Sequence, residues 1–228
     1  LQTGRLIPLV DNDDGGVGTC SRVQQVFQPG NYAVAVNDFG NNEPIDDYRL
    51  SIECISCLNA PRPAAGELVI NEIFQNPTAA QDVTEFVEVR NISDGPRDLF
   101  GVILRDDDND SFTIPNSVVV APGGYAVLAR EGDPGGYMPD VEYNGYFLAN
   151  GSDEVVLDTW KGVEIDRVNY DDGATFPDPN GASMQFDGDF PPDAADNDDG
   201  DNWCEGDQAF GAGDLATPGE ANTTCNRV

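Results

Sequence analysis

The 228-residue sequence contains no histidine and a single lysine, Lys161. Without histidine, the chain lacks the commonest general base and the commonest metal ligand among the side chains. No serine or cysteine can be activated by a histidine partner, so triad chemistry is excluded. No apolar run is long enough to span a bilayer. The sequence therefore predicts neither a serine or cysteine hydrolase nor a membrane-inserted protein.

Cysteines are few, and with no histidine in the chain a zinc site is not expected. Cys54 and Cys57 have the spacing of a redox motif, but nothing around them suggests the βαβ unit in which that motif works. We interpret the five cysteines as structural, in an oxidising compartment, which predicts a secreted or cell-surface protein. The chain begins at Leu1 without a recognisable signal peptide, and we interpret it as a mature or trimmed fragment of a longer protein.

Acidic residues dominate the composition, with 42 Asp and Glu against 11 Lys and Arg and a net charge of −31. Such a surface repels nucleic-acid phosphates and anionic lipids, so neither is an expected partner. It attracts Ca²⁺ and other cations, and salt screens its self-repulsion. We therefore expect the folded chain to be stabilised by salt.

Three acidic runs are candidate calcium sites, at residues 11–16, 106–110 and 196–201. The run at residues 11–16 resembles half of a calcium loop, although Arg22 stands where an EF-hand loop needs its last acidic ligand. The second run covers residues 106–110. For all three runs the favoured interpretation is a turn whose carboxylates face water. The candidate calcium ligands are Asp11, Asp13, Asp14, Asp106, Asp108 and Asp110.

Two β-rich runs, residues 67–74 and 84–91, place carboxylates among apolar residues. Glu72 lies in the first run, and Glu85 and Glu88 lie in the second. A buried carboxylate is costly unless it is paired or hydrogen-bonded. These runs therefore predict strands in a fold that supplies specific partners for the three side chains.

The sequence Ile70-Asn71-Glu72-Ile73, together with Glu-Phe-Val-Glu-Val-Arg-Asn at 85–91, resembles the opening of the lamin tail domain. This domain recurs in bacterial secreted proteins, and the resemblance implies an all-β, immunoglobulin-like β-sandwich. Phe100 and Val102 depart from the family's pattern, where serine and tryptophan are usual. Further similar segments follow in the family's order up to residue 225: DLFGVIL at 98–104, APGGYAVLA at 121–129, LANGSDEVVL at 148–157, VEIDRVNY at 163–170, GASMQ at 181–185, NW at 202–203 and TPGEAN at 217–222.

The resemblance also bears on the three glutamates. Paired carboxylates can serve as the acid and base of a glycosidase. However, Asn71, Glu72, Glu85 and Glu88 coincide with the pattern that the family shares, which implies a role in the scaffold. We therefore expect these side chains to satisfy donors inside the sandwich.

Residues 1–57 are similar to the last part of the bacterial pre-peptidase C-terminal domain, a small β-sandwich. The matching residues include the turn at 13–16, the Pro-Gly-Asn-Tyr run at 29–32 and the strand-like Tyr-Arg-Leu-Ser-Ile at 48–52. The resemblance covers only the last part of that family's domain, so either its earlier strands lie outside this chain, or another chain or the larger domain covers the open face. A proline- and alanine-rich linker, residues 58–66, separates this partial domain from the larger domain, residues 67–228.

The expected disulfides are Cys204–Cys225, which fastens the Trp203 region to the chain end, and Cys20–Cys54. Cys57 is left without a partner inside the chain. Aromatic residues could line a carbohydrate-binding surface, but we favour core and loop packing, because aromatic side chains supply much of the apolar area of a β-sandwich. They are Trp160, Phe176, Phe186, Phe190 and Trp203.

The leading hypothesis is a non-catalytic module of a secreted or cell-surface bacterial protein, acting in adhesion, assembly or binding. A narrower version is a subunit of an extracellular fibre or surface layer, in which a neighbouring copy completes the open sheet edge. This version predicts protein partners and homo-oligomers. The alternative is the accessory C-terminal region of a secreted protease, nuclease or phosphatase whose catalytic domain lies upstream. A stand-alone hydrolase that uses carboxylates is the third hypothesis.

Overall fold

The computed structural model describes residues 60–78, 84–130, 137–211 and 213–225. In these ranges the chain consists of short β-strands, and the helical element is a 3₁₀ turn, η1 (Gly200–Asn202). The strands are β1 (Leu68–Phe74), β2 (Phe86–Asn91), β3 (Arg97–Asp98), β4 (Ile103–Arg105), β5 (Ser111–Thr113), β6 (Val119–Val120), β7 (Tyr125–Arg130), β8 (Val141–Tyr143), β9 (Ser152–Asp158), β10 (Glu164–Asp171), β11 (Met184–Phe186), β12 (Trp203–Glu205), β13 (Ala209–Phe210) and β14 (Asp214–Leu215).

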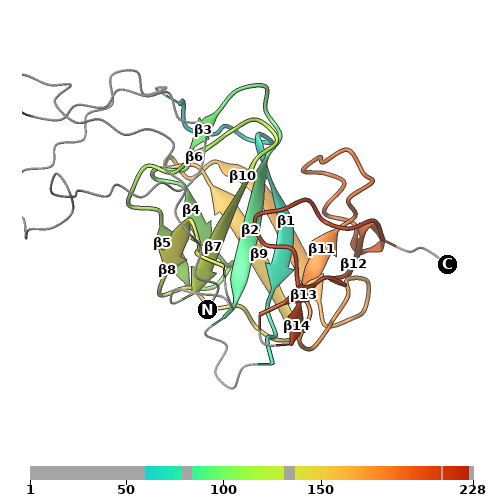
Figure 1. Cartoon of the computed structure of the whole chain (residues 1–228). Helices are drawn as coiled ribbons and strands as arrows, with labels where there is room; N and C mark the ends of the chain where they lie inside the picture. Colours follow the sequence, from blue (N-terminus) through green and yellow to red (C-terminus); the bar gives the residue numbers. More distant parts are fainter. Residues whose placement is uncertain (1–59, 79–83, 131–136, 212, 226–228) are drawn as a thin grey trace, which may run out of the picture. The chain divides into compact units, whose positions relative to one another are not determined.

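The strands form two main sheets that enclose the core. The six-stranded sheet has the order β12-β11-β1-β2-β7-β8, and the four-stranded sheet has the order β10-β9-β4-β5. The strand pairs are antiparallel except for β7 and β8. In Figure 1, β9 and β10 lie behind β1 and β2, with the loops at the ends of the strands. The all-β, immunoglobulin-like sandwich predicted from the sequence is confirmed.

A β-bulge in β1 decides which side chains face the core. The pairing of β1 with β2 shifts register between Ile70 and Glu72, so Asn71 is an extra residue in the ladder. Because side chains alternate along a strand, one extra residue moves all later side chains to the opposite face. Ile70 and Ile73 therefore both reach the main core. Without the bulge, Glu72 would project into that core.

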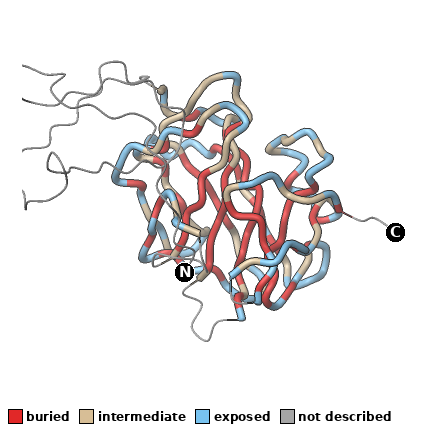
Figure 2. Tube along the Cα trace, viewed as in Figure 1, coloured by how far each residue is buried: buried red, intermediate tan, exposed pale blue. Residues whose placement is uncertain are grey.

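The outer face of the six-stranded sheet is also buried. Phe74 and Phe86 form a second apolar cluster there, and Phe210 of the C-terminal segment packs edge-on against both rings. The C-terminal segment, drawn in red in Figure 1, carries β13 and β14 across this face. Figure 2 shows β1 buried along its whole length as a result. Residues beyond the β10 strand are thus part of the domain's packing.

Cys204 and Cys225 form the disulfide that the sequence predicts, with their Cα atoms 5.6 Å apart. It fastens β12 to the end of the C-terminal segment. Cys20, Cys54, the Asp11–Asp13–Asp14 turn and the 1–57 domain lie outside the described residues, and these predictions stay untested. Among the residues that are described, no helix is long and apolar enough to cross a membrane.

Candidate functional site

Glu72 projects from β1 onto the outer face of the six-stranded sheet, beneath the C-terminal segment, and is fully buried. Its Oε1 accepts hydrogen bonds from the Ser183 hydroxyl and from the backbone N–H of Thr217, the latter at 2.8 Å. Its Oε2 has no hydrogen-bond partner among the described residues. Burial raises the pKa of Glu72 to about 7, so the side chain retains a proton well above the ordinary glutamate range.

Glu88 lies directly opposite Glu72 on β2 and is also fully buried. It accepts hydrogen bonds from the Asn71 side-chain amide at 2.7 Å and from the Gly219 backbone N–H at 2.6 Å. Burial raises the pKa of Glu88 well above its usual range, and the adjacent Glu72 adds to the shift. Two carboxyls this close in a low-dielectric site cannot both ionise readily.

The glutamate pair therefore fixes the C-terminal segment to the sheet. Asn222 extends the same contact, because its side-chain amide donates to the backbone oxygens of Asn71 and Phe186, each at 2.7 Å. Raised pKa values alone would suit general acid–base catalysis. Here the oxygens that accept hydrogen bonds receive them from protein groups, and the segment covers them, so the arrangement matches the scaffold role expected from the sequence.

Glu85, the third predicted glutamate, is also buried. It forms an ion pair with Arg130 of β7 at 3.3 Å. The Arg130 guanidinium in turn lies over the exposed Phe147 ring, 4.4 Å from its centroid. Glu85 is thus separate from the Glu72–Glu88 pair and belongs to the neighbouring strand contact.

In the described structure, the carboxylates of the acidic turn at 106–110 are not grouped as a calcium site would require. Asp106 uses its carboxylate to accept hydrogen bonds from the backbone N–H groups of Asp108 and Asp110, at 2.9 and 3.1 Å. Asp108 is exposed and points its charge to water. Across the described part of the chain, no three acidic or cysteine side chains are grouped to hold a metal ion. The turn is stabilised by its own backbone donors.

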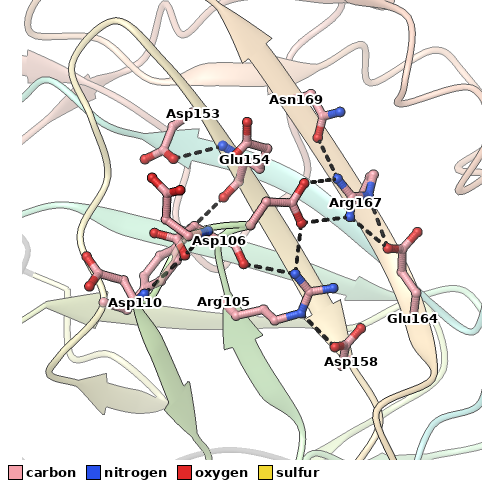
Figure 3. A network of polar contacts seen from close by, with 12 residues as sticks. Arg105, Asp106, Asp110, Asp153, Glu154, Asp158, Glu164, Arg167 and Asn169 are labelled. Carbon is pink, nitrogen blue, oxygen red and sulfur yellow. Dashed lines mark hydrogen bonds and ion pairs between the residues drawn. The ribbon is translucent and has the colours of Figure 1, made fainter.

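Asp107 of the same turn is instead clamped by two arginines on the outer face of the four-stranded sheet. Arg167 of β10 binds both of its oxygens, at 2.9 and 3.1 Å, and Arg105 of β4 binds one at 2.9 Å. Figure 3 shows these arginines also engaging Glu164 and Asp158. Hydrogen bonds from Arg167 and then Arg105 lower the pKa of Asp107 to about 2. This network of surface ion pairs links β4 to β10 through Asp107.

Most of the aromatic residues considered for carbohydrate binding are in the core. Phe176, Phe186 and Trp203 are buried and pack against one another. Phe190 is partly buried against Phe186. Trp160 differs, with 54% of its surface exposed. Core packing, the interpretation favoured from the sequence, is therefore confirmed for Phe176, Phe186 and Trp203, and Trp160 is the exception.

Trp160 belongs to a cluster that we call the aromatic–cationic patch: Arg62, Phe100, Trp160 and Lys161. The Arg62 guanidinium carbon lies 4.7 Å from the centroid of the Phe100 ring and 5.1 Å from that of Trp160. The Lys161 ammonium lies 4.9 Å from the centroid of the Trp160 ring. Cation–π contacts of this kind hold the side chains in a defined arrangement at the surface.

The patch can form because the backbone at Gly101 lies close to Trp160 and Arg62. Gly101 has φ of +84°, a conformation that glycine adopts without strain. A β-carbon there would lie 3.2 Å from the Trp160 β-carbon and 3.7 Å from an Arg62 nitrogen. The turn between β3 and β4 thereby brings Phe100 beside the β9–β10 turn.

The cations of the patch have no carboxylate partner among the described residues, although the chain has a net charge of −31. Asp98, which lies close by in sequence, is engaged by the Ser117 hydroxyl and by the Val118 N–H. Most other arginines of the described chain form ion pairs with Asp or Glu: Arg97, Arg105, Arg130 and Arg167. Arg90 is the exception, because it lies over the Tyr125 ring and has no ion pair among the described residues. The patch is therefore a positive, partly apolar surface on an acidic protein.

Neither Arg62 nor Phe100 was predicted to be a site residue from the sequence. Arg62 lay within the supposed linker, and its contacts depend on loops far apart in sequence. A signal existed for Phe100, because an exposed aromatic stands where the family's pattern has serine. A second signal was Lys161, the single lysine, which directly follows Trp160.

Comparison with known proteins agrees with the fold. No curated protein matches the sequence. Residues 61–172 match the sequence model of the Lamin Tail Domain family, and this segment includes every residue of the aromatic–cationic patch. The structure adds β11, β12 and the C-terminal segment to the same packed unit. By its sequence over residues 61–172 and by its immunoglobulin-like fold, the chain is similar to the lamin tail domains.

Proposed function

We propose that this chain is a non-catalytic binding or assembly module of a secreted or cell-surface protein, and that it acts through the aromatic–cationic patch. The observation that carries the proposal is the placement of Arg62 between two exposed rings, with no carboxylate partner in the described chain. Aromatic residues and arginine are the side chains enriched at protein contact sites.

The buried carboxyls support the non-catalytic part of the proposal. Glu72 and Glu88 accept hydrogen bonds from backbone groups of the C-terminal segment, at Thr217 and Gly219. A catalytic acid or base must come within hydrogen-bond distance of its substrate. These two carboxyls could do so only if the C-terminal segment left the sheet. The Cys204–Cys225 disulfide holds that segment and also agrees with an oxidising compartment.

A binding assay with matched variants tests the proposal. The probes are alginate as a carboxylated polysaccharide, cellulose as a neutral polysaccharide, and the immobilised chain itself. We expect binding to at least one probe that is lost in Trp160→Ala and Arg62→Ala. Phe147→Ala is the control, because Phe147 is another exposed ring beneath an arginine. Failure to bind any probe, or equal binding by all variants, would contradict the proposal.

Catalysis is tested separately. Peptide, phosphoester and glycoside substrates should show no turnover above buffer. If turnover appears, Glu72→Gln and Glu85→Gln decide its origin: activity that these substitutions abolish while the proteins remain folded would overturn the non-catalytic assignment.

A further inference from the structure

The chain carries a surface segment whose chemistry complements the aromatic–cationic patch. Residues 189–201, here called the acidic loop, connect β11 to β12 and contain six aspartates and the pair Pro191–Pro192. Pro191 is exposed, and none of the aspartates forms an ion pair in the described chain. The exposed aspartates are Asp189, Asp193, Asp196, Asp198, Asp199 and Asp201.

Hydrogen bonds from Asn197, in the middle of the acidic loop, hold the loop against the domain. The Asn197 side chain is fully buried, and its amide donates to the Asp166 carboxylate at 2.8 Å and to the Ile70 backbone oxygen at 3.2 Å. The backbone oxygen of Asn197 also accepts a hydrogen bond from the Trp203 indole at 2.8 Å. These contacts present the flanking aspartates to solvent as a shaped surface.

The acidic loop and the patch are both attached to the beginning of β10. Asn197 contacts Asp166 near the start of that strand. Trp160 and Lys161 lie in the turn that leads into it at Glu164. Both surfaces are therefore tied to residues at the start of β10.

We propose that the patch binds the acidic loop of a second copy of this chain, in a reciprocal, two-fold symmetric dimer. This inference rests on the proposed function and names its partner. In such an interface each surface meets its complement on the other copy. Aspartate carboxylates pair with Arg62 and Lys161, and the Pro191–Pro192 pair packs on the rings of Phe100 and Trp160. Arginine is suited to the role because its planar donors match a carboxylate.

A protein ligand fits the patch better than a polysaccharide does. Sugars stack on open aromatic faces, whereas here Arg62 lies over both rings and Lys161 lies over Trp160. The net charge of −31 opposes the approach of two copies. At physiological ionic strength, however, the Debye length is about 8 Å, so the local opposite charges decide the contact once the surfaces meet.

Charge reversal with mixing tests this inference. The patch variant is Arg62→Glu with Lys161→Glu, and the loop variant is Asp193→Lys with Asp196→Lys. We expect the wild-type chain to dimerise in sedimentation velocity at about 0.15 M salt. Each variant alone should associate at least about tenfold more weakly, because like charges then face one another. An equimolar mixture should recover a heterodimer, since both of its contacts are again complementary.

The control carries the same charge change elsewhere: Asp108→Lys with Asp178→Lys, two exposed aspartates outside the acidic loop. It should dimerise at least as well as the wild type. Circular dichroism and thermal unfolding verify that every variant is folded. A monomeric wild type at all concentrations, or separate variants that do not recover on mixing, would overturn the inference. Patch-dependent binding to alginate by a chain that stays monomeric would overturn it while leaving the proposed function intact.

Discussion

Two acidic regions of this molecule respond to their surroundings in opposite ways. The Glu72–Glu88 pair lies under the C-terminal segment, where burial raises the pKa of both carboxyls. Asp107 lies on the outer face of the four-stranded sheet, where hydrogen bonds from Arg167 and Arg105 lower its pKa to about 2. The chemical group is nearly the same in the two regions, and the difference comes from solvent and from cationic partners.

The pKa of a carboxyl in this chain thus depends on whether it is buried and on whether a cation lies beside it. The buried Glu72 and Glu88 carboxyls accept hydrogen bonds from neutral donors, and burial raises the pKa of both. The exposed Asp107 carboxylate is instead paired with Arg105 and Arg167. The aromatic–cationic patch belongs to neither group, because its cations have no carboxylate partner in the described chain. This contrast places scaffold and contact functions at different sites.

The largest change in unfolding free energy is expected for a substitution in the Glu72–Glu88 pair. Glu88→Leu leaves the Asn71 amide and the Gly219 N–H short of an acceptor. Unsatisfied buried donors cost about 1–3 kcal/mol each, so unfolding free energy should fall by about 4 kcal/mol. Urea unfolding measures the change. Glu88→Gln retains an acceptor oxygen and should cost much less; equal losses in the two variants would show that the hydrogen bonds are not the cause.

The pH dependence should be nearly as large. The pKa of Glu72 is raised in the folded state, so the folded chain binds this proton more tightly than the unfolded chain does. Its stabilisation is complete below the ordinary glutamate value of 4.5 and is lost as pH rises through about 7. That shift corresponds to roughly 3 kcal/mol.

The test compares the wild type with Glu72→Gln in urea unfolding at pH 5 and at pH 8. Glu72→Gln removes one titrating group while the other groups near the site, Glu88, Asp140 and Tyr137, remain. The variant should therefore lose less stability between the two pH values. A loss identical to that of the wild type would contradict the assignment.

Removal of the disulfide should have an effect of similar size. Cys204 and Cys225 are separated by 21 residues, and opening a loop of this length costs about 3 kcal/mol in the chain-entropy model. Cys204→Ser with Cys225→Ser should lower the unfolding midpoint accordingly, and reductant should destabilise the wild type more than the variant, which keeps Cys20 and Cys54. If reductant has no effect on the wild type, the bond does not stabilise the domain.

The smallest effect is expected at Asp107. Its carboxylate pairs with Arg105 and Arg167, but its side chain is 49% exposed, so solvent screening weakens both pairs. Asp107→Asn should cost about 0.5 kcal/mol or less. Because the pKa of Asp107 is lowered, its contribution is present above the ordinary aspartate value and is lost as pH falls toward 2. A loss equal to that of Glu88→Leu would remove the contrast between the regions.

Much of the fold could be predicted from the sequence. The runs at 67–74 and 84–91 become β1 and β2, and their carboxylates do find internal donors. The bulge at Asn71 could not be predicted, because both registers leave apolar residues on each face. The outer cluster around Phe210 was missed for a similar reason: the C-terminal segment has few apolar residues, and its burial depends on tertiary contact.

The candidate site was less predictable. Arg62, Phe100 and Trp160 come from three separate loops, and no local pattern reports that they meet. The acidic turn at 106–110 looked like a metal site because composition shows carboxylates but not their directions. In the fold, Asp107 turns to arginines and Asp106 turns to backbone N–H groups. Spacing alone could not distinguish these outcomes.

The central claim is that the glutamate pair serves the scaffold and the aromatic–cationic patch serves contact. The most direct test measures binding to the immobilised chain and thermal unfolding on the same samples of Glu72→Gln and Trp160→Ala. The account predicts that Glu72→Gln changes the pH dependence of unfolding and keeps wild-type binding. Trp160→Ala should unfold as the wild type does and lose binding. Loss of binding in Glu72→Gln at unchanged stability, with binding retained in Trp160→Ala, would contradict it.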